Sequence, residues 1–449
     1  MRLLRTAGKL APVLCALAGI LSASVLPGYL GGEAWPQQES AGGRLISDLG
    51  CPACHEIKGH TTTIQAEAPD LTAGGEKVRP AWLFTFLKRP HAVRPWLRGR
   101  MPDFHLTDQE SLAITEYLQS LKDPAIPVAS GPSPRTAAPD ALAAGARLVS
   151  KDYFDCLNCH QQGDKKPEGP PDGWAPDLAL ARARLKSDWV TRWVQDPQKL
   201  QPGTKMPAFF PGGPPDILGG DDAKQILALK DYLLSLGQAP AGAYDEAKEK
   251  YPQVTAALGE KLVVAFNCAG CHKIGRLART LRPGPALSWE GSKVREPWLL
   301  GFLKEPTLLR PQGEARMPSF RLSNTEAFAL TSYIRETLTA PDVSRTVFRS
   351  GEATGALIAE GKRLFESELG CRTCHRVDKE GALGGPELTS VASRLEEGWL
   401  FHWIRDPKRF EPHAPMPKVG ITDDEAKAVT AYLAHRRSAP RPAGNAGGR

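Results

Sequence analysis

Eight of the nine cysteines in this 449-residue chain belong to four copies of the pattern Cys-x-x-Cys-His. This spacing is the attachment signature of c-type haem. A short helical turn lets two thiols bond to the haem vinyl groups while the adjacent imidazole turns back to bind iron. The pattern therefore predicts four covalently bound haem c groups. The four copies are Cys51, Cys54 and His55; Cys156, Cys159 and His160; Cys268, Cys271 and His272; and Cys371, Cys374 and His375.

Other uses of paired cysteines explain this pattern less well. A structural zinc site does not need a histidine directly after every cysteine pair. A thioredoxin-like redox pair needs one motif on a βαβ unit, and the sequence shows no alternation of strands with helices. Disulfide bonds in an exported protein would leave the four histidines without a role. Haem attachment accounts for the cysteines and the histidines together.

The four methionines after Met1 occupy one position of an internal repeat of roughly 100 residues. Each is followed by proline and lies 46, 46, 45 or 41 residues after the motif histidine of its unit. Methionine is usually core filler, but one methionine per motif at this spacing predicts a thioether as the sixth iron ligand. His/Met ligation raises the reduction potential of haem. The predicted ligands are Met101, Met206, Met317 and Met416.

Few other histidines could compete with these methionines. None lies between His160 and His272 or between His272 and His375, so the second and third units have no further histidine after their motifs. In the fourth unit His413 lies three residues before Met416, and a ligand exchange there stays open. The other histidines are expected to face solvent. They are His60, His91, His105, His402 and His435.

The other recurring positions of the repeat predict the helices that position these groups. A short helix with a recurrent glycine precedes each motif, and a helix that carries a tyrosine ends each unit, so we expect the tyrosine to pack over an opposing glycine. After each motif, a prolyl carbonyl is expected to accept the second N–H of the ligating imidazole. A tryptophan and a second aromatic residue four positions later share one helix face, which we expect to pack on the porphyrin. The glycines are Gly42, Gly145, Gly259 and Gly361; the tyrosines Tyr117, Tyr232, Tyr333 and Tyr432; the prolines Pro69, Pro176, Pro285 and Pro386; and the tryptophans Trp82, Trp189, Trp298 and Trp399.

With these features in this order along the chain, each unit resembles a class I c-type cytochrome. The resemblance implies an all-α fold of four tandem cytochrome c-like domains, each wrapped round one covalently attached haem. It implies the four motif histidines as proximal ligands and the four methionines as distal ligands. The tandem plan is also similar, more weakly, to dihaem cytochrome subunits of bacterial quinol-oxidising complexes. The expected domains are residues 38–122, 139–238, 253–339 and 354–437.

The two ends of the chain carry different signals. Three basic residues precede an apolar run over residues 10–26. This pattern predicts a signal peptide over residues 1–34, with a retained membrane anchor as the alternative. We therefore expect an exported protein, in the periplasm or on the outer face of the cytoplasmic membrane. The basic segment 438–449 is expected to be a disordered tail.

Composition and charge restrict the function further. With 41% hydrophobic and 24% charged residues, the chain is not a polytopic membrane protein, and a net charge of +7 is too small to indicate nucleic acid. A basic run without acidic residues precedes Met101, and such a run is usually an ordinary solvated face. The alternative is a rim beside the haem edge that attracts an acidic redox partner. The run comprises Lys77, Arg79, Lys88, Arg89, Arg94, Arg98 and Arg100.

These features predict an electron carrier rather than an enzyme. It would pass single electrons between a quinol-linked respiratory donor, such as a membrane quinol-oxidising complex, and a downstream acceptor. Membrane association would come through the N-terminus or through that complex. The alternative is a haem enzyme of the peroxidase or nitrogen-oxide reductase type, in which one iron keeps an open coordination position.

Overall fold

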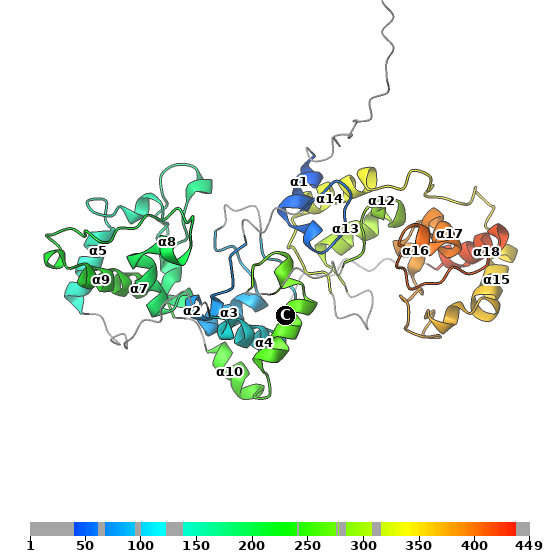
Figure 1. Cartoon of the computed structure of the whole chain (residues 1–449). Helices are drawn as coiled ribbons and strands as arrows, with labels where there is room; N and C mark the ends of the chain where they lie inside the picture. Colours follow the sequence, from blue (N-terminus) through cyan, green and yellow to red (C-terminus); the bar gives the residue numbers. More distant parts are fainter. Residues whose placement is uncertain are drawn as a thin grey trace, which may run out of the picture. The chain divides into compact units, whose positions relative to one another are not determined.

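In the computed structural model the chain is described for residues 40–61, 68–94, 100–122, 138–239, 242–274, 277, 284–307 and 316–436. The predicted signal segment and the predicted tail lie outside these residues. The described part is mostly helical (Figure 1), and its extended pairings are isolated β-bridges, as the all-α class predicts. None of the helices described is both long and apolar enough to cross a bilayer.

The helices follow the fourfold repeat of the sequence. The first unit contains α1 (Ala41–Asp48), α2 (Gly74–Lys77), α3 (Pro80–Lys88) and α4 (Asp108–Ser120). The second contains α5 (Pro139–Val149), α6 (Ala181–Arg184), α7 (Ser187–Gln195), α8 (Pro197–Leu200) and α9 (Asp222–Ser235). The third contains α10 (Ala243–Lys250), α11 (Ala256–Ala265), α12 (Glu290–Lys293), α13 (Glu296–Lys304) and α14 (Asn324–Thr337). The fourth contains α15 (Gly355–Arg363), the π-helix η9 (Leu364–Glu368), α16 (Val391–Arg394), α17 (Glu397–Arg405) and α18 (Asp423–Ala434).

Local sequence signals set the ends of these helices. Three of the four terminal helices begin with the capping box that the sequence predicts, and Asp221 caps α9 by accepting the backbone N–H of Lys224 at 3.1 Å. Each aromatic helix ends two residues before a proline, because the residue before proline is disfavoured in the helical region. These prolines are Pro90, Pro197, Pro306 and Pro407.

In the second and fourth units the helix before the motif packs on the terminal helix of the same unit. Gly145 of α5 lies against Tyr232 of α9, and Gly361 of α15 lies against Tyr432 of α18. A Cβ atom at Gly361 would lie 1.8 Å from the carbonyl oxygen of Ala428. The predicted glycine–tyrosine contact is confirmed in these two units.

The first and third units exchange their N-terminal segments. α1 packs on α14 of the third unit, and α11 packs on α4 of the first unit (Figure 1). The same glycine–tyrosine contact forms in both places, between Gly42 and Tyr333 and between Gly259 and Tyr117. The helix before the first motif and the helix before the third motif therefore each pack on the terminal helix of the other unit. That residues 38–122 and 253–339 each wrap round one haem stays a prediction. Since the two units present equivalent helix faces, either face accepts the segment of the other unit.

The exchange produces two composite bodies. Body A consists of residues 40–61 and 284–338, and body B of residues 68–122 and 242–277, with the gaps given above. The connecting segments 62–67 and 278–283 lie outside the described residues. Each body has its own apolar core, and α10 extends the core of body B by packing Tyr244 against α3 and α4.

Matching contacts from each body join body A to body B. The two methionine loops pair as an antiparallel bridge, in which Asp103 and Ser319 exchange both backbone hydrogen bonds at 2.7 Å. Arg100 of body B pairs with Glu326 of body A, and Arg316 of body A pairs with Glu110 of body B. Both glutamates also belong to helix capping boxes. The second and fourth units have Lys205 and Pro415 in place of these arginines.

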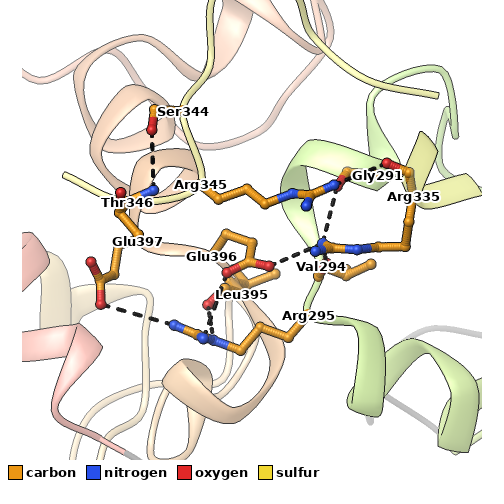
Figure 2. Close-up of polar contacts among 10 residues, drawn as sticks. All are labelled: Gly291, Val294, Arg295, Arg335, Ser344, Arg345, Thr346, Leu395, Glu396 and Glu397. Carbon is orange, nitrogen blue, oxygen red and sulfur yellow. Dashed lines mark hydrogen bonds and ion pairs between the residues drawn. The ribbon is translucent and has the colours of Figure 1, made fainter. Parts of the chain in front are cut away.

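A second kind of contact joins each body to a neighbouring unit. Val78 of body B forms an antiparallel bridge with Leu185 of the second unit, and Val294 of body A forms the same bridge with Leu395 of the fourth unit. At the latter contact Arg335 donates to Glu396 at 3.0 Å, and both residues are less than a tenth exposed (Figure 2).

Removing Glu396 should loosen the contact between body A and the fourth unit. We expect Glu396→Ala to lower the free energy of unfolding by about 3–5 kcal/mol, because it leaves the Arg335 charge buried without its carboxylate. Glu397→Ala is the matched control: Glu397 is half-buried and lies 4.0 Å from Arg295, so its loss should cost under about 1 kcal/mol. Urea unfolding of the two variants measures the difference, and equal losses would contradict the prediction.

The glycine in α1 should tolerate no side chain. A Cβ atom at Gly42 would lie 2.3 Å from the carbonyl oxygen of Ala329, so Gly42→Ala should destabilise the protein by about 1–3 kcal/mol. Gly301 in α13 of the same body is the control, because nothing lies within 4 Å of its Cβ position. Gly301→Ala should stabilise by about 0.5–1 kcal/mol through helix propensity. Thermal unfolding of both variants tests the contrast.

Candidate haem sites

Each Cys-x-x-Cys-His motif folds as the same short turn. The first three residues form a 3₁₀ helix, and the backbone N–H of the histidine donates to the carbonyl of the first cysteine at 2.8–3.0 Å. The residue before the first cysteine always has a left-handed backbone conformation, with φ between 45° and 72°. Glycine, asparagine and aspartate tolerate this conformation best. The sequence prediction did not include this recurring position. The residues are Gly50, Asp155, Asn267 and Gly370.

The eight motif cysteines are available for attachment. None of them forms a disulfide in the part of the chain described. Burial raises the pKa of Cys51 and Cys268 to about 12 and that of Cys156 to about 11, so these thiols stay protonated. Thiols without disulfide partners fit covalent attachment to the vinyl groups of a haem.

A prolyl carbonyl holds each motif histidine in one orientation. The distances from Nδ1 to the proline oxygen are 2.9, 2.8, 3.0 and 2.9 Å for His55, His160, His272 and His375. Because a carbonyl only accepts hydrogen bonds, the imidazole proton resides on Nδ1 and Nε2 keeps a lone pair for a metal. Burial lowers the pKa of His55, His160 and His272, which favours the neutral form that binds iron. A prolyl acceptor is confirmed for all four histidines, and in the second and fourth units it is the predicted proline of the same unit.

In the composite bodies the proline belongs to the other unit. His55 is held by Pro285, and His272 by Pro69, whereas His160 and His375 are held by Pro176 and Pro386 of their own units. Gly284 packs directly on the ring of His55, where a Cβ atom would lie 2.4 Å from Cε1. The exchange thus extends from the helices to the positioning of the ligand itself.

The two motifs of the exchanged pair also contact each other. The side-chain amide of Asn267 donates to the carbonyl oxygen of Ala53 at 3.0 Å and to Cys54 Sγ at 3.5 Å. Cys271 is near enough to Cys51 to raise the pKa of that thiol. The first and third attachment sites are therefore direct neighbours.

One connected cavity of about 2200 Å³ links the first three sites. It is lined by the histidines of the first three motifs and by Met101, Met206 and Met317. It reaches the fourth unit at His413 and the aromatic pair of α17, but His375 and Met416 are not among its lining residues. The pairing of His375 with Met416 therefore stays a prediction.

The aromatic helices face this cavity as the sequence predicts. In each pair the two rings lie nearly parallel, with centroids 4.6 to 6.1 Å apart. All eight rings line the cavity. Flat aromatic walls and free Nε2 atoms in an apolar cavity fit the porphyrin that the motifs imply. The pairs are Trp82 and Phe86, Trp189 and Trp193, Trp298 and Phe302, and Trp399 and Trp403.

Met101 and Met317 pack with the motif of the other unit rather than with that of their own. Met101 packs in the core that contains Cys268, and Met317 packs in the core that contains Cys51. The structure thus groups the first motif with the methionine of the third unit and the third motif with that of the first. In the second unit the indole N–H of Trp193 donates to the sulfur of Met206 at 2.9 Å.

Two segments of the chain, residues 40–122 and 358–437, match the family model described as Cytochrome c. Both segments are similar to cytochrome c. The two segments include the first and the fourth motif, each with its proline, its aromatic helix and its methionine. A search of curated proteins finds no match.

The expectation that His60 faces solvent is wrong. It is only 6% exposed, and its Nε2 lies 2.7 Å from the hydroxyl of Tyr333. Because α1 and α14 come together only through the exchange, the sequence of one unit could not indicate this partner. His402 is half-buried, whereas His91, His105, His413 and His435 are exposed.

Four of the seven residues of the basic run before Met101 make contacts within the protein. Lys77 lies over Trp189 of the second unit, and Arg79 donates to the carbonyl of Leu185. Lys88 pairs with Asp108, and Arg100 pairs with Glu326 of body A. Of the others, Arg89 is exposed, Arg94 is half-buried and Arg98 lies outside the described residues. That the run attracts an acidic redox partner stays a prediction.

Haem bound at these sites would supply one-electron redox chemistry. The chain would hold the iron from one side through Nε2 of the motif histidines, which the prolines orient. The methionine loops lie in the same cores and offer a thioether. The aromatic pairs would cover the porphyrin faces and exclude water.

Proposed function

We propose that this chain is an exported tetrahaem cytochrome c that carries single electrons through four His/Met-ligated haems. The observation that carries the proposal is the orientation of the four motif histidines. In each, Nδ1 is hydrogen-bonded to a prolyl carbonyl, which leaves Nε2 available to bind iron. Two cytochrome c family matches support haem binding and electron transfer. A chain that binds four haems and no substrate would be a carrier or a subunit of an oxidoreductase complex.

The haems would lie in the order second, third, first, fourth. The third motif belongs to body B, which contacts the second unit through Val78 and Leu185. The first motif belongs to body A, which contacts the fourth unit through Val294 and Leu395. Since the motifs of bodies A and B touch each other, electrons would enter and leave through the second and fourth units.

The partners we propose are redox proteins. The donor would be quinol-linked, such as a membrane quinol-oxidising complex, and the acceptor would lie downstream in a respiratory chain. The basic N-terminal pattern and the covalent haem motifs support export to the periplasm or to the outer face of the cytoplasmic membrane.

Haem counting and spectroscopy test the proposal. Pyridine haemochrome analysis should give four haems per chain, and the oxidised protein should show the thioether–iron charge-transfer absorbance at the red end of the spectrum. A high-spin haem that binds carbon monoxide readily would support the enzyme alternative for that unit. Co-purification from membranes would identify the donor complex.

A further inference from the structure

Two basic side chains, those of Lys77 and Arg184, reach across the contact between body B and the second unit. Lys77 is the last residue of α2, and Arg184 is the last residue of α6. The bridge between Val78 and Leu185 sets these helix ends side by side, with backbone hydrogen bonds of 2.8 and 3.0 Å on either side of it. Each cation therefore reaches over the aromatic helix of the neighbouring body.

The two parts make equivalent contacts, since each places a basic side chain over an aromatic ring of the other. Lys77 Nζ lies 5.3 Å from the ring centroid of Trp189 and 5.8 Å from that of Trp193. Arg184 Cζ lies 5.3 Å from the ring centroid of Trp82. Both cations line the connected cavity. Each thus stands beside the aromatic wall of the haem site in the other body.

The charge of this pair is not balanced in the part of the chain described. No carboxylate there forms an ion pair with Lys77 or Arg184, and Arg184 Nε is buried without a hydrogen-bond acceptor. The nearby Asp70 is engaged by Lys273. Burial and the neighbouring cations lower the pKa of Lys77 to about 8 and that of Arg184 to about 10. Both side chains are half-buried, and because unpaired charge that is partly removed from water is costly, this arrangement favours a bound anion.

We propose that Lys77 and Arg184 form a carboxylate-binding site shared between body B and the second unit. This inference rests on the proposed function, because the carboxylates are those of the two haems. Lys77 binds a carboxylate of the haem attached at Cys156, and Arg184 binds one of the haem attached at Cys268. Each haem is then held partly by the body to which it is not attached, and the two centres are electrostatically linked.

The corresponding contact with the fourth unit supplies a built-in comparison. Lys293 ends α12 and flanks the same kind of bridge, at Val294. It already has a carboxylate, because Glu290 lies 2.8 Å from its Nζ. Gly74 stands at the equivalent position before Lys77. Lys293 lowers and Glu290 raises the pKa of His55, so the matched control replaces both residues together and leaves the net charge unchanged.

The test compares Lys77→Gln, Arg184→Gln and the double variant Glu290→Gln, Lys293→Gln in the full-length haem-loaded protein by spectroelectrochemistry. A cation favours the reduced haem, which carries one positive charge fewer, so losing it lowers the midpoint potential. We expect a lower midpoint for one haem in Lys77→Gln and for a different haem in Arg184→Gln. The double variant Glu290→Gln, Lys293→Gln removes a paired cation and carboxylate and should keep the wild-type midpoints, and so should Lys77→Arg. Unchanged midpoints in Lys77→Gln, or Lys77→Arg shifting as far as Lys77→Gln, would overturn the proposal.

Two further measurements separate the remaining outcomes. A midpoint that responds to inorganic phosphate in the wild type but not in Lys77→Gln would identify a solution anion and overturn the haem carboxylate. If the glutamine variants do not accumulate, the carboxylate bands of the reduced-minus-oxidised infrared spectrum should shift in Arg184→Lys, and unchanged bands would overturn the proposal. A haem count below four defeats the proposed function itself, whereas four haems with unchanged midpoints defeat only this inference.

Discussion

Cutting the chain between its two halves should not separate them. A protease site inserted between Ala239 and Gly242 divides the chain into an N-terminal fragment with the first two motifs and a C-terminal fragment with the last two. We expect both fragments to elute from a sizing column as one species of full mass. The reason is that α1 of the first fragment lies on α14 of the second, while α11 of the second lies on α4 of the first.

The association should survive high salt. The helix crossings bury apolar residues on both sides, whereas the Arg100 and Arg316 ion pairs are partly exposed and are screened at 1 M salt. A denaturing gel shows that cleavage is complete, and the uncut protein with the same insertion is the control. Two separate peaks of half mass at high salt would show that the halves do not share their cores.

The local features of each site could be predicted from the sequence because they depend on short-range patterns. The motif, the prolyl acceptor and the i, i+4 aromatic pair each act over one or two helical turns. A capping box is read from residues three positions apart, and Thr107 with Glu110 forms as expected. All these features recur four times, so a comparison of the units reveals them.

The exchange could not be predicted because it is a choice between equivalent partners. Tyr117 and Tyr333 occupy the same repeat position, so the glycine of either unit fits either helix. One signal does separate the exchanging units, since arginine precedes the methionine only in the first and third. Its meaning depends on a contact more than two hundred residues away, between Arg100 and Glu326. A pattern within one unit does not indicate which residue of another unit will contact it.

The exchange also predicts which methionine serves which haem. In a Cys268→Ala, Cys271→Ala background, which lacks the third haem, replacing Met101 with alanine should leave the spectra of the three remaining haems unchanged. In a background that lacks the first haem, through Cys51→Ala and Cys54→Ala, the same replacement should remove one thioether–iron absorbance. The physical reason is that Met101 packs in the core of Cys268, not in that of Cys51.

Met317 should behave in the opposite way, because it packs in the core of Cys51. Its replacement should be silent without the first haem and visible without the third. Met206→Ala is the matched control, since the second unit keeps its own methionine, and it should remove one absorbance in both backgrounds. Each background must first show three haems by pyridine haemochrome. If Met101→Ala removed an absorbance in the background without the third haem, the thioether would belong to its own unit and the exchange would not extend to the ligands.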